Sequence, residues 1–412
     1  MIKETKKPKI LFMFGGLPHY LIAQLNKLHC TDMFEVIVVV PAGKRATIGK
    51  GVEENVKGNL FQVVYTEEFI TFYKKPFHKN FSEILQTIQP DILVTMWPYV
   101  LGFVLYPKLW KVVKRLNISL VLKEIPFMVP KLGESSSFYK QNPVFDENLV
   151  QEPNSGFFFL LKNFVIERLR KKYYSRLSAT VNYVEEAKNI LPTYNFPPEK
   201  IFVTYNSPDT DELFEAKAAA NLLPPLLPEN KHRILHVGRL VKWKKVDLLI
   251  QSVSRLKNKY ADIELVVIGK GPEENALKKL AEELKISEKI IFAGGIYQTV
   301  QLAQYLKESS IYVLAGMGGL SINEAMVCGK PIICSVCDGT EKHLVRNGYN
   351  GYFFQDDSLE DLSEKIDLLL SNPQKMNEMG ENSYKIIANE ININTVITKY
   401  IEAFNFVLKN KK

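Results

Sequence analysis

Short apolar runs alternate with longer stretches of helical character along the whole chain. In the first half the apolar runs lie at residues 10–14, 34–40, 61–65, 92–96, 118–122, 179–183 and 201–204. Helical stretches lie between them at residues 17–28, 81–88, 102–116 (interrupted or started at Pro107), 157–176 and 185–191. Strands separated by helices of this length indicate a parallel sheet with helices on both faces, so the predicted fold class is α/β.

The second half repeats this alternation. Its strands are predicted at residues 234–237, 263–268, 290–292, 311–314, 331–334 and 352–354, and its helices at 246–256, 273–284, 359–370 and 394–409. The segment 206–210 has the composition of a turn, and the proline-rich segment 222–230 that of a linker or an exposed loop. We therefore predict a first domain at residues 1–205, a second at 206–390 and a C-terminal helix at 391–412.

The stretch 315–326 carries the strongest functional motif. An apolar strand at 311–314 runs into a turn that contains Gly318 and Gly319, and the turn opens a helix with Glu324 about one turn in. Glycine lets a backbone approach a ligand closely, and a helix N-terminus suits a phosphate group. Glu324 could accept hydrogen bonds from sugar hydroxyls. The alternative interpretation is a tight strand-to-helix turn with a solvated glutamate.

Other strands of the second half also end in glycine or in a basic residue. These ends are Gly238-Arg239, Gly269-Lys270-Gly271 and Gly294-Gly295. Ligands of open parallel sheets bind at the carboxyl ends of the strands, so these ends together predict a pocket for a diphosphate. Arg239 would clamp two oxygens there and Lys244 would act as a point charge. Each turn taken alone is better explained by chain geometry.

These residues resemble a known family. The motifs are His236-Val237-Gly238-Arg239-Leu240, Lys244, Val246-Asp247-Leu248-Leu249, Val267-Ile268-Gly269-Lys270-Gly271-Pro272, Asn323-Glu324-Ala325-Met326, Gly329-Lys330-Pro331 and Asn347-Gly348-Tyr349-Asn350-Gly351. They resemble the second domain of the retaining glycosyltransferases of family 4, specifically over residues 234–370 and more loosely before them. The resemblance implies the GT-B fold, in which two Rossmann-like domains face each other across a cleft and a C-terminal helix crosses back to the first domain.

The resemblance also implies which residues bind the donor. Arg239 and Lys244 match the basic pair that steadies the donor diphosphate, and Glu324 matches the glutamate that binds the nucleotide ribose. Donor contacts are expected from Gly16, Gly238, Gly269, Gly271, Gly318, Gly319, Leu320 and Ser321. The implied co-substrate is a UDP- or GDP-linked sugar held mainly by the second domain, with the acceptor held mainly by the first. No metal or other cofactor is expected, because Arg and Lys supply the positive charge.

Two positions depart from the family pattern. The family has another glutamate eight positions before Glu324, where this chain has Gly316. The family also often has a histidine in a loop of the first domain, where this chain reads Lys123-Glu124-Ile125-Pro126-Phe127. Glu124 could take a polar role there or be structural. His19, beside the Gly15-Gly16 turn, is the nearest candidate for an acceptor or phosphate contact.

Composition and charge limit the partners. The net charge of +8, from 53 basic and 45 acidic residues among 412, suits anionic ligands but is too diffuse for a nucleic-acid-binding stripe. We expect no signal peptide, since the N-terminus leads into a short strand. We also expect no transmembrane segment, since the most membrane-like uncharged stretch, residues 92–107, contains Pro98 and is shorter than the ~20 residues that a spanning helix needs. The four cysteines suit free thiols of a reducing compartment. A cytoplasmic location follows as the expectation.

Residues 157–176 leave two interpretations open. Apolar residues from Phe157 to Ile166 precede a basic cluster that ends at Arg176. Such a segment can seat a helix in the headgroup region of an anionic membrane, so the protein could be peripheral on the inner face of the plasma membrane. The other interpretation is a long helix packed on its domain with a solvated basic end.

The function expected from these features is hexosyl transfer. The donor would be a nucleotide diphosphate sugar, and transfer would occur with retention to a saccharide or lipid-linked acceptor in bacterial cell-surface polysaccharide synthesis. One alternative is a sugar-nucleotide epimerase, whose acid–base groups would have to come from Glu124, Glu324 and His19. Another is a non-catalytic partner subunit of the same fold, which Gly316 favours and the presence of Arg239 and Lys244 opposes.

Overall fold

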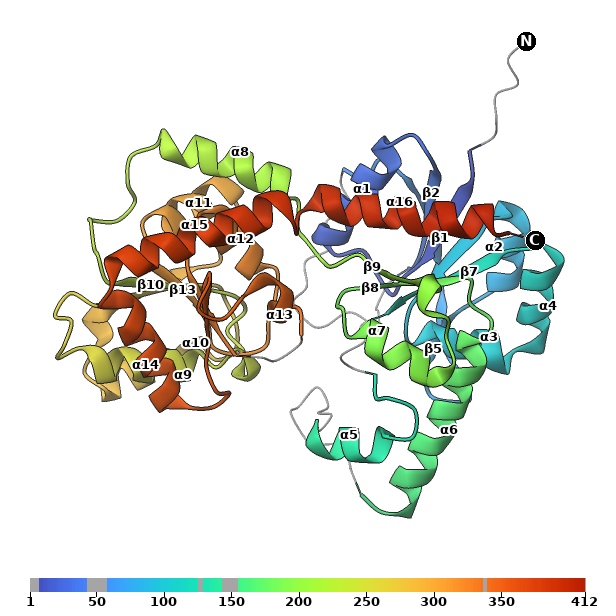
Figure 1. The fold of residues 1–412 in the computed structure, drawn as a ribbon, viewed down its shortest axis with the longest axis horizontal. Helices are drawn as coiled ribbons and strands as arrows, with labels where there is room; N and C mark the ends of the chain where they lie inside the picture. Colours follow the sequence, from blue (N-terminus) through green and yellow to red (C-terminus); the bar gives the residue numbers. More distant parts are fainter. Residues whose placement is uncertain (1–6, 43–57, 125–128, 143–154, 336–338, 412) are drawn as a thin grey trace, which may run out of the picture. The chain divides into compact units, whose positions relative to one another are not determined.

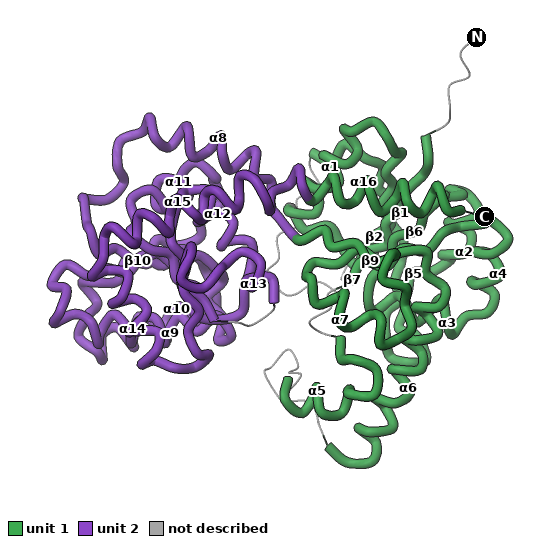
Figure 2. Tube along the Cα trace, in the orientation of Figure 1, with its two compact units in different colours: residues 1–205, 396–412 green, residues 206–395 purple. Residues whose placement is uncertain are grey.

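A computed structural model describes residues 7–42, 58–124, 129–142, 155–335 and 339–411. The chain divides into two compact units (Figure 2), residues 1–205 with 396–412 and residues 206–395. Each unit is built on one parallel sheet, so the predicted α/β class is confirmed.

The first unit contains a seven-stranded sheet in the order β3-β2-β1-β6-β7-β8-β9. Every neighbouring pair is parallel. The strands are β1 (Lys9–Met13), β2 (Glu35–Pro41), β3 (Gln62–Thr66), β6 (Ile92–Thr95), β7 (Ser119–Glu124), β8 (Ala179–Asn182) and β9 (Ile201–Val203). A short antiparallel pair, β4 (Glu68–Ile70) and β5 (Pro76–His78), stands apart from this sheet.

Helices cover both faces of this sheet, because successive side chains of a strand point to opposite sides. Leu11 and Met13 of β1 join the core formed with α2 (Phe81–Ile88), α3 (Gly102–Leu105), α4 (Pro107–Arg115) and α6 (Phe157–Tyr174). Phe12 and Phe14 point to the other face, against α1 (His19–Cys30) and α16 (Ile393–Lys409). The remaining helices are α5 (Ser135–Gln141), which packs on α6, and α7 (Ala187–Ile190).

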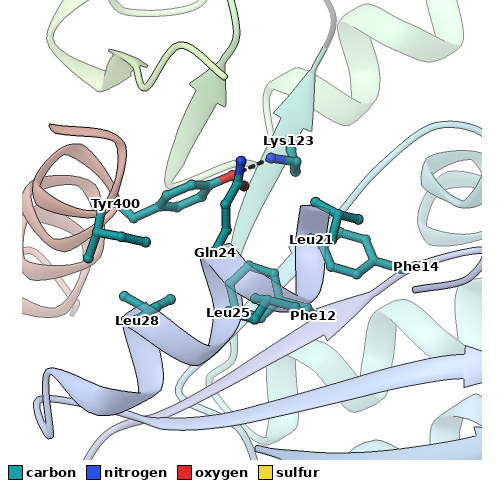
Figure 3. Close-up of a pocket in the computed structure, with 9 residues that line it drawn as sticks. Phe12, Phe14, Leu21, Gln24, Leu25, Leu28, Lys123 and Tyr400 are labelled. Atoms are coloured by element: carbon teal, nitrogen blue, oxygen red, sulfur yellow. Dashed lines mark hydrogen bonds between the residues drawn. The ribbon is translucent and has the colours of Figure 1, made fainter. Parts of the chain in front are cut away.

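The C-terminal helix α16 is part of the first unit from residue 396 onward. The ring of Phe404 packs edge-on against Phe12 and Phe34, with centroid distances of 6.1 and 5.7 Å. In Figure 3 the buried ammonium of Lys123 donates a hydrogen bond to the Tyr400 hydroxyl, in a small pocket lined mainly by apolar side chains of β1 and α1. Burial lowers the pKa of Lys123 to about 7.

The second unit contains a six-stranded parallel sheet in the order β12-β11-β10-β13-β14-β15. The strands are β10 (Arg233–Val237), β11 (Glu264–Ile268), β12 (Ile290–Gly294), β13 (Ile311–Leu314), β14 (Ile332–Cys334) and β15 (Gly351–Phe353). Two groups of helices flank it (Figure 1): α9 (Val246–Leu256), α10 (Glu274–Glu283) and α14 (Leu359–Leu370) on one side, and α8 (Thr210–Asn221), α11 (Thr299–Lys307), α12 (Ser321–Val327) and α15 (Pro373–Asn389) on the other. A short helix, α13 (Glu341–Leu344), precedes β15.

The two halves of α6 differ in how far they agree with the two interpretations of residues 157–176, a membrane-binding helix or a helix packed on its domain. Its second half packs on the first unit as predicted by the packed-helix alternative, since Tyr173 and Tyr174 are buried. Its first half does not, because Phe157 and Phe158 are 72% and 83% exposed. Within the described residues no helix is both long enough and apolar enough to cross a membrane.

Candidate functional site

The strand order of the second unit reverses between β10 and β13, which pair with each other although β11 and β12 separate them in the chain. Open α/β sheets bind ligands at such a switch point, outside the carboxyl ends of the strands. Here the loop after β10 begins with Gly238 and Arg239, and the loop after β13 contains Gly316, Gly318 and Gly319. These two loops form the candidate site.

The glycines after β11 have a packing role. Gly269 has a φ of +146°, and a Cβ there would lie 1.8 Å from the Gly238 carbonyl oxygen. A Cβ on Gly271 would lie 2.2 Å from the Leu240 carbonyl oxygen. Only residues without a side chain allow the loops after β10 and β11 to lie directly on each other. These glycines therefore shape the loop that carries Arg239.

Gly316 is fixed by the same kind of contact. A Cβ at this position would lie 2.1 Å from the carbonyl oxygen of Trp243, and the neighbouring Met317 N–H donates to that oxygen at 2.9 Å. The backbone of the 242–244 turn thus packs against the glycine-rich turn after β13. The family's glutamate could not be placed at Gly316 on this backbone, which gives the departure a steric reason.

Lys244 connects the two loops of the site. Its Nζ donates to the carbonyl oxygens of Met317 at 2.8 Å and of Gly318 at 2.9 Å. The same Nζ lies 3.5 Å from where a Cβ of Gly319 would be. Because α12 has only seven residues, the ammonium of Lys244 is the stronger source of positive charge at this turn.

Arg239 and Glu324 belong to the two segments that form the site, the loop after β10 and the helix α12 that follows the turn. The guanidinium of Arg239 stands 5.7 Å from the centre of the Trp243 ring. Glu324 is in the first turn of α12 and half-buried, and its withdrawal from water raises its pKa to about 7. A carboxyl group poised this way can change protonation state near neutral pH, which is typical of functional sites.

Two buried side chains support the site in roles that the sequence did not predict. The Tyr312 hydroxyl lies 2.7 Å from Ser321 Oγ and 3.3 Å from the Val237 carbonyl oxygen, so it ties the start of α12 to the end of β10. His236 Nδ1 donates to the Val313 carbonyl oxygen at 3.1 Å. Burial and the nearby charge of Lys244 lower the pKa of His236 to about 4, so its ring is neutral.

Trp243 is a third supporting residue that the sequence did not reveal. It acts through its backbone oxygen on Met317 and through its ring beside Arg239. A backbone contact has no signature in residue type, and only its place three residues after Leu240, inside the matched motif region, could have drawn attention to it.

The remaining candidates lie in the first unit. Gly16 follows β1, whose carboxyl end is at the corresponding switch point with β6. His19 is the first residue of α1, and its side chain is outside what the structure describes. Glu124 ends β7, is buried, and accepts a hydrogen bond from the Tyr174 hydroxyl at 3.1 Å. Residues 125–127 of the predicted loop lie outside the described residues.

Known proteins are similar to this chain in part of its sequence and in its fold. Residues 223–386 match the family model described as Glycosyl transferases group 1. An uncharacterized glycosyltransferase of Haemophilus influenzae is 33% identical over 184 residues, which is 42% of this chain and 51% of that protein. An N,N'-diacetylbacillosaminyl-diphospho-undecaprenol alpha-1,3-N-acetylgalactosaminyltransferase of Campylobacter jejuni is 28% identical over 215 residues, 52% of each chain. The matched part thus spans about half the length of these curated relatives.

Solved structures match almost the entire chain. HepE of Anabaena in complex with UDP has a TM-score of 0.67 at 15% identity, over 97% of this chain and 100% of that one. A glycosyltransferase of Rickettsia africae also has a TM-score of 0.67, at 19% identity, over 98% of this chain and 100% of that one. At such identities the likeness establishes the fold. The chain therefore has the GT-B fold of two Rossmann-like halves, and its residues 223–386 match the group 1 glycosyltransferase family model.

Proposed function

We propose that this protein is a retaining glycosyltransferase of family 4 that moves a hexosyl group from a nucleotide diphosphate sugar to a saccharide or lipid-linked acceptor. The observation that carries the proposal is Lys244, which joins the turns after β10 and β13 at the switch point of the second sheet. Arg239 lies on the same loop, and both residues are inside the segment that matches the family model.

The chemical role of this pair follows from charge. Transfer breaks the bond between the anomeric carbon and the β-phosphate oxygen, and the nucleoside diphosphate leaves with the electron pair. A guanidinium and an ammonium fixed beside the diphosphate stabilise the negative charge that develops, which is usually the largest catalytic contribution. Arg239 and Lys244 would do this without a metal ion.

The other residues of the site would orient the nucleotide. In its ionised form Glu324 would accept hydrogen bonds from the two ribose hydroxyls. Gly318, Gly319 and Leu320 would present backbone to the phosphates, with Ser321 held in place by Tyr312. Gly238, Gly269 and Gly271 would contribute by holding the loop of Arg239 in shape.

The first unit would bind the acceptor, with Gly16, His19 and Glu124 at or near that site. The sugar product would belong to a cell-surface polysaccharide made at the cytoplasmic face of a bacterial membrane. Two observations support this part: the exposed apolar and basic residues of α6, and the undecaprenol-linked acceptor in the name of the Campylobacter relative.

Donor binding tests the proposal most directly. The purified protein would be titrated with UDP, GDP and ADP sugars in a calorimeter, and each mixture would be assayed for slow nucleotide release. We expect one donor to bind tightly with detectable release. Conversion of the bound sugar to its epimer without release would instead favour an epimerase, and binding of none would favour a non-catalytic subunit.

A further inference from the structure

One side of α6 carries an exposed apolar stripe that continues into a basic cluster. The exposed apolar residues are Phe157, Phe158, Leu160, Leu161, Phe164 and Val165. At about 100° per residue they fall within an arc of about 160° around the helix. Arg168, Lys171 and Lys172 fall inside the same arc one to two turns later, and the Arg168 guanidinium lies 4.9 Å from the Phe164 ring centre. The apolar and basic groups therefore form one continuous face.

The opposite side of α6 is packed against the first unit. Its buried residues are Asn163, Glu167, Arg170, Tyr173 and Tyr174. The C-terminal end of the helix lies against the sheet, while its N-terminal end extends away from it beside α5 (Figure 1). The apolar stripe is thus on the side that the described part of the first unit leaves uncovered.

We propose that α6 inserts with its N-terminal end first into an anionic lipid bilayer. Two features favour lipid over a protein partner. Among the described residues, no acidic side chain forms an ion pair with Arg168, Lys171 or Lys172, and these three positive charges lie next to six exposed apolar residues. The order along the helix also fits the layers of a membrane, in which an apolar interior is bounded by phosphates.

The length of the apolar stretch, compared with the thickness of one leaflet, indicates how α6 is oriented in the bilayer. The six exposed apolar residues lie within the first nine positions of α6, about 12 Å at 1.5 Å per residue, which is less than the ~15 Å of one leaflet's hydrocarbon. The exposed Lys162 also lies in this stretch, about 40° outside the arc of the apolar residues. Arg168 follows only three residues later, at the level where headgroup phosphates begin. A helix lying flat on the surface would instead carry apolar residues along its whole length.

This orientation restricts the acceptor, a step that rests on the proposed function. Near the other end of α6 the hydroxyls of Tyr173 and Thr95 share a hydrogen bond, and Tyr174 donates to Glu124. Thr95 and Glu124 end β6 and β7, at the carboxyl edge of the sheet. Tyr174 is six residues beyond Arg168, about 9 Å along the helix. The acceptor would therefore be an amphiphile whose reacting hydroxyl stands within about 10 Å of the bilayer phosphates.

Vesicle flotation tests the membrane interaction without any sugar transfer, so its failure is distinguishable from failure of the proposed activity. We expect the wild-type protein to float with vesicles containing phosphatidylglycerol and to bind neutral phosphatidylcholine vesicles much less. Replacing Arg168, Lys171 and Lys172 by Gln should lower the partition on the order of 100-fold, since each charge contributes about 1 kcal/mol. Phe157→Ser with Phe158→Ser should abolish flotation.

Matched controls separate α6 from general charge and hydrophobicity. Replacement of the three exposed lysines of α4 (Lys108, Lys111 and Lys114) by Gln removes the same charge from the same unit. Phe72→Ser with Leu222→Ser removes residues that are 75% and 88% exposed elsewhere. Both controls should float like the wild type. Equal losses in the controls, or a wild-type protein that stays at the bottom of the gradient, would overturn the proposal.

Depth-dependent quenching tests the orientation. Tryptophan is placed at Phe158 or at Lys172, and quenching by lipids brominated deep in the acyl chain is measured as the difference from the wild type, whose three tryptophans give the background. Insertion tip-first predicts strong quenching at position 158 and weak quenching at 172. Equal quenching would show a flat helix and contradict the proposal. A vesicle-independent dimer that Phe157→Ser with Phe158→Ser dissolves would instead assign the stripe to a second copy of the chain.

Discussion

Lys244 is the single side chain on which the proposed chemistry depends most. Its ammonium both supplies charge and holds the carbonyl groups of Met317 and Gly318. We expect Lys244→Ala to lower kcat/KM by about 10³-fold, the scale seen when one preorganised charge donor is removed, while the protein stays folded. Lys242→Ala, at an exposed lysine of the same turn, is the matched control. Unchanged turnover in Lys244→Ala would refute the proposed role.

Two glycines of the turn after β13 should respond to alanine in opposite ways. At Gly316 an added Cβ meets the Trp243 oxygen at 2.1 Å, so the backbone must shift, and we expect a loss of about 1–3 kcal/mol of stability. At Gly319 the nearest atom to a Cβ is Lys244 Nζ at 3.5 Å, an ordinary contact. Gly319→Ala should keep the melting temperature yet weaken nucleotide-sugar binding by about tenfold, because the methyl group would occupy the place of a phosphate oxygen.

The comparison needs both thermal unfolding and donor titration on each variant. A Gly316→Ala protein as stable as the wild type would mean that the 242–244 turn can move away. That result would remove the steric account of the missing glutamate and would make Gly316→Glu the next variant to assay.

Glu324 predicts a pH dependence of donor affinity. With a pKa of about 7, it is about one-tenth ionised at pH 6 and about nine-tenths ionised at pH 8. The carboxylate accepts hydrogen bonds from the ribose hydroxyls more strongly than the neutral acid does, so affinity should rise from pH 6 to pH 8, by up to about tenfold. Calorimetric titration of the nucleotide sugar at several pH values measures this rise. Glu324→Gln should bind more weakly at pH 8 and lose most of the dependence, and a full rise in that variant would assign the titration to another group.

At the residue scale, the sequence located the groups that carry charge but not those that position them. Arg239, Lys244 and Glu324 were found because charged residues follow strand ends in a recognisable order. Tyr312 looks like an ordinary strand residue in the sequence, and His236 stands in a family motif that gives it no role. Their contributions are a hydroxyl contact and a ring hydrogen bond across the sheet, and these depend on which strands become neighbours.

At the scale of elements, apolar periodicity correctly predicted the helices that have large apolar residues along one face. The helices predicted at residues 246–256 and 359–370 are α9 and α14 with the same bounds, because large buried residues mark their inner faces. No helix was predicted from the sequence at α8, α11 or α15. Leu213 is the one large apolar residue among the four buried residues of α8, and α15 contains Gly380 in its interior, so neither helix gives a clear apolar stripe.

The docking of α16 offers an element-scale prediction at Lys123. Its lowered pKa means that between about pH 7 and its ordinary 10.5 the unfolded chain binds a proton that the folded chain does not. Stability should therefore rise with pH across this window, and the cost of the buried charge is greatest below it. Lys123→Met removes that cost. We expect a higher melting temperature at pH 6.5, by about 2–4 °C for each kcal/mol gained, and a smaller gain at pH 9.

The melting temperature of Lys123→Met also compares the cost of burying the Lys123 ammonium with the favourable contacts that this ammonium makes. The ammonium lies 4.4 Å from the Tyr183 ring centre and 5.1 Å from that of Tyr400, in addition to its hydrogen bond with the Tyr400 hydroxyl. If Lys123→Met melts below the wild type at pH 6.5, these contacts outweigh desolvation, and Tyr400→Phe should then show a similar loss. An exposed control such as Lys279→Met should leave the pH profile unchanged.

At the scale of the whole molecule, the chain leaves the first unit at residue 205 and returns to it at residue 396. Hydrogen bonds join the two ends of the second unit. Ile393 N–H donates to Thr210 Oγ1 at 3.0 Å, and Asn394 Nδ2 donates to Asp211 at 3.1 Å. The first unit, by contrast, obtains part of its core from α16. The second unit is therefore the continuous one and should be the more independent in folding.

This organisation predicts that residues 206–395 alone fold and bind nucleotide. Among the predicted donor contacts only Gly16 lies outside this segment. The contacts that shape the site, from Lys244 to the 316–318 turn and from Tyr312 to Ser321, all lie inside it. We expect the isolated segment to bind the nucleoside diphosphate of the preferred donor with an affinity within about tenfold of that of the full chain, a loss of at most about 1.4 kcal/mol.

Circular dichroism would establish folding of the isolated segment, and calorimetry would measure its nucleotide binding. A folded segment that binds no nucleotide would place most of the donor affinity in the first unit, and Gly16 with the turn after β1 would then become the primary donor contact.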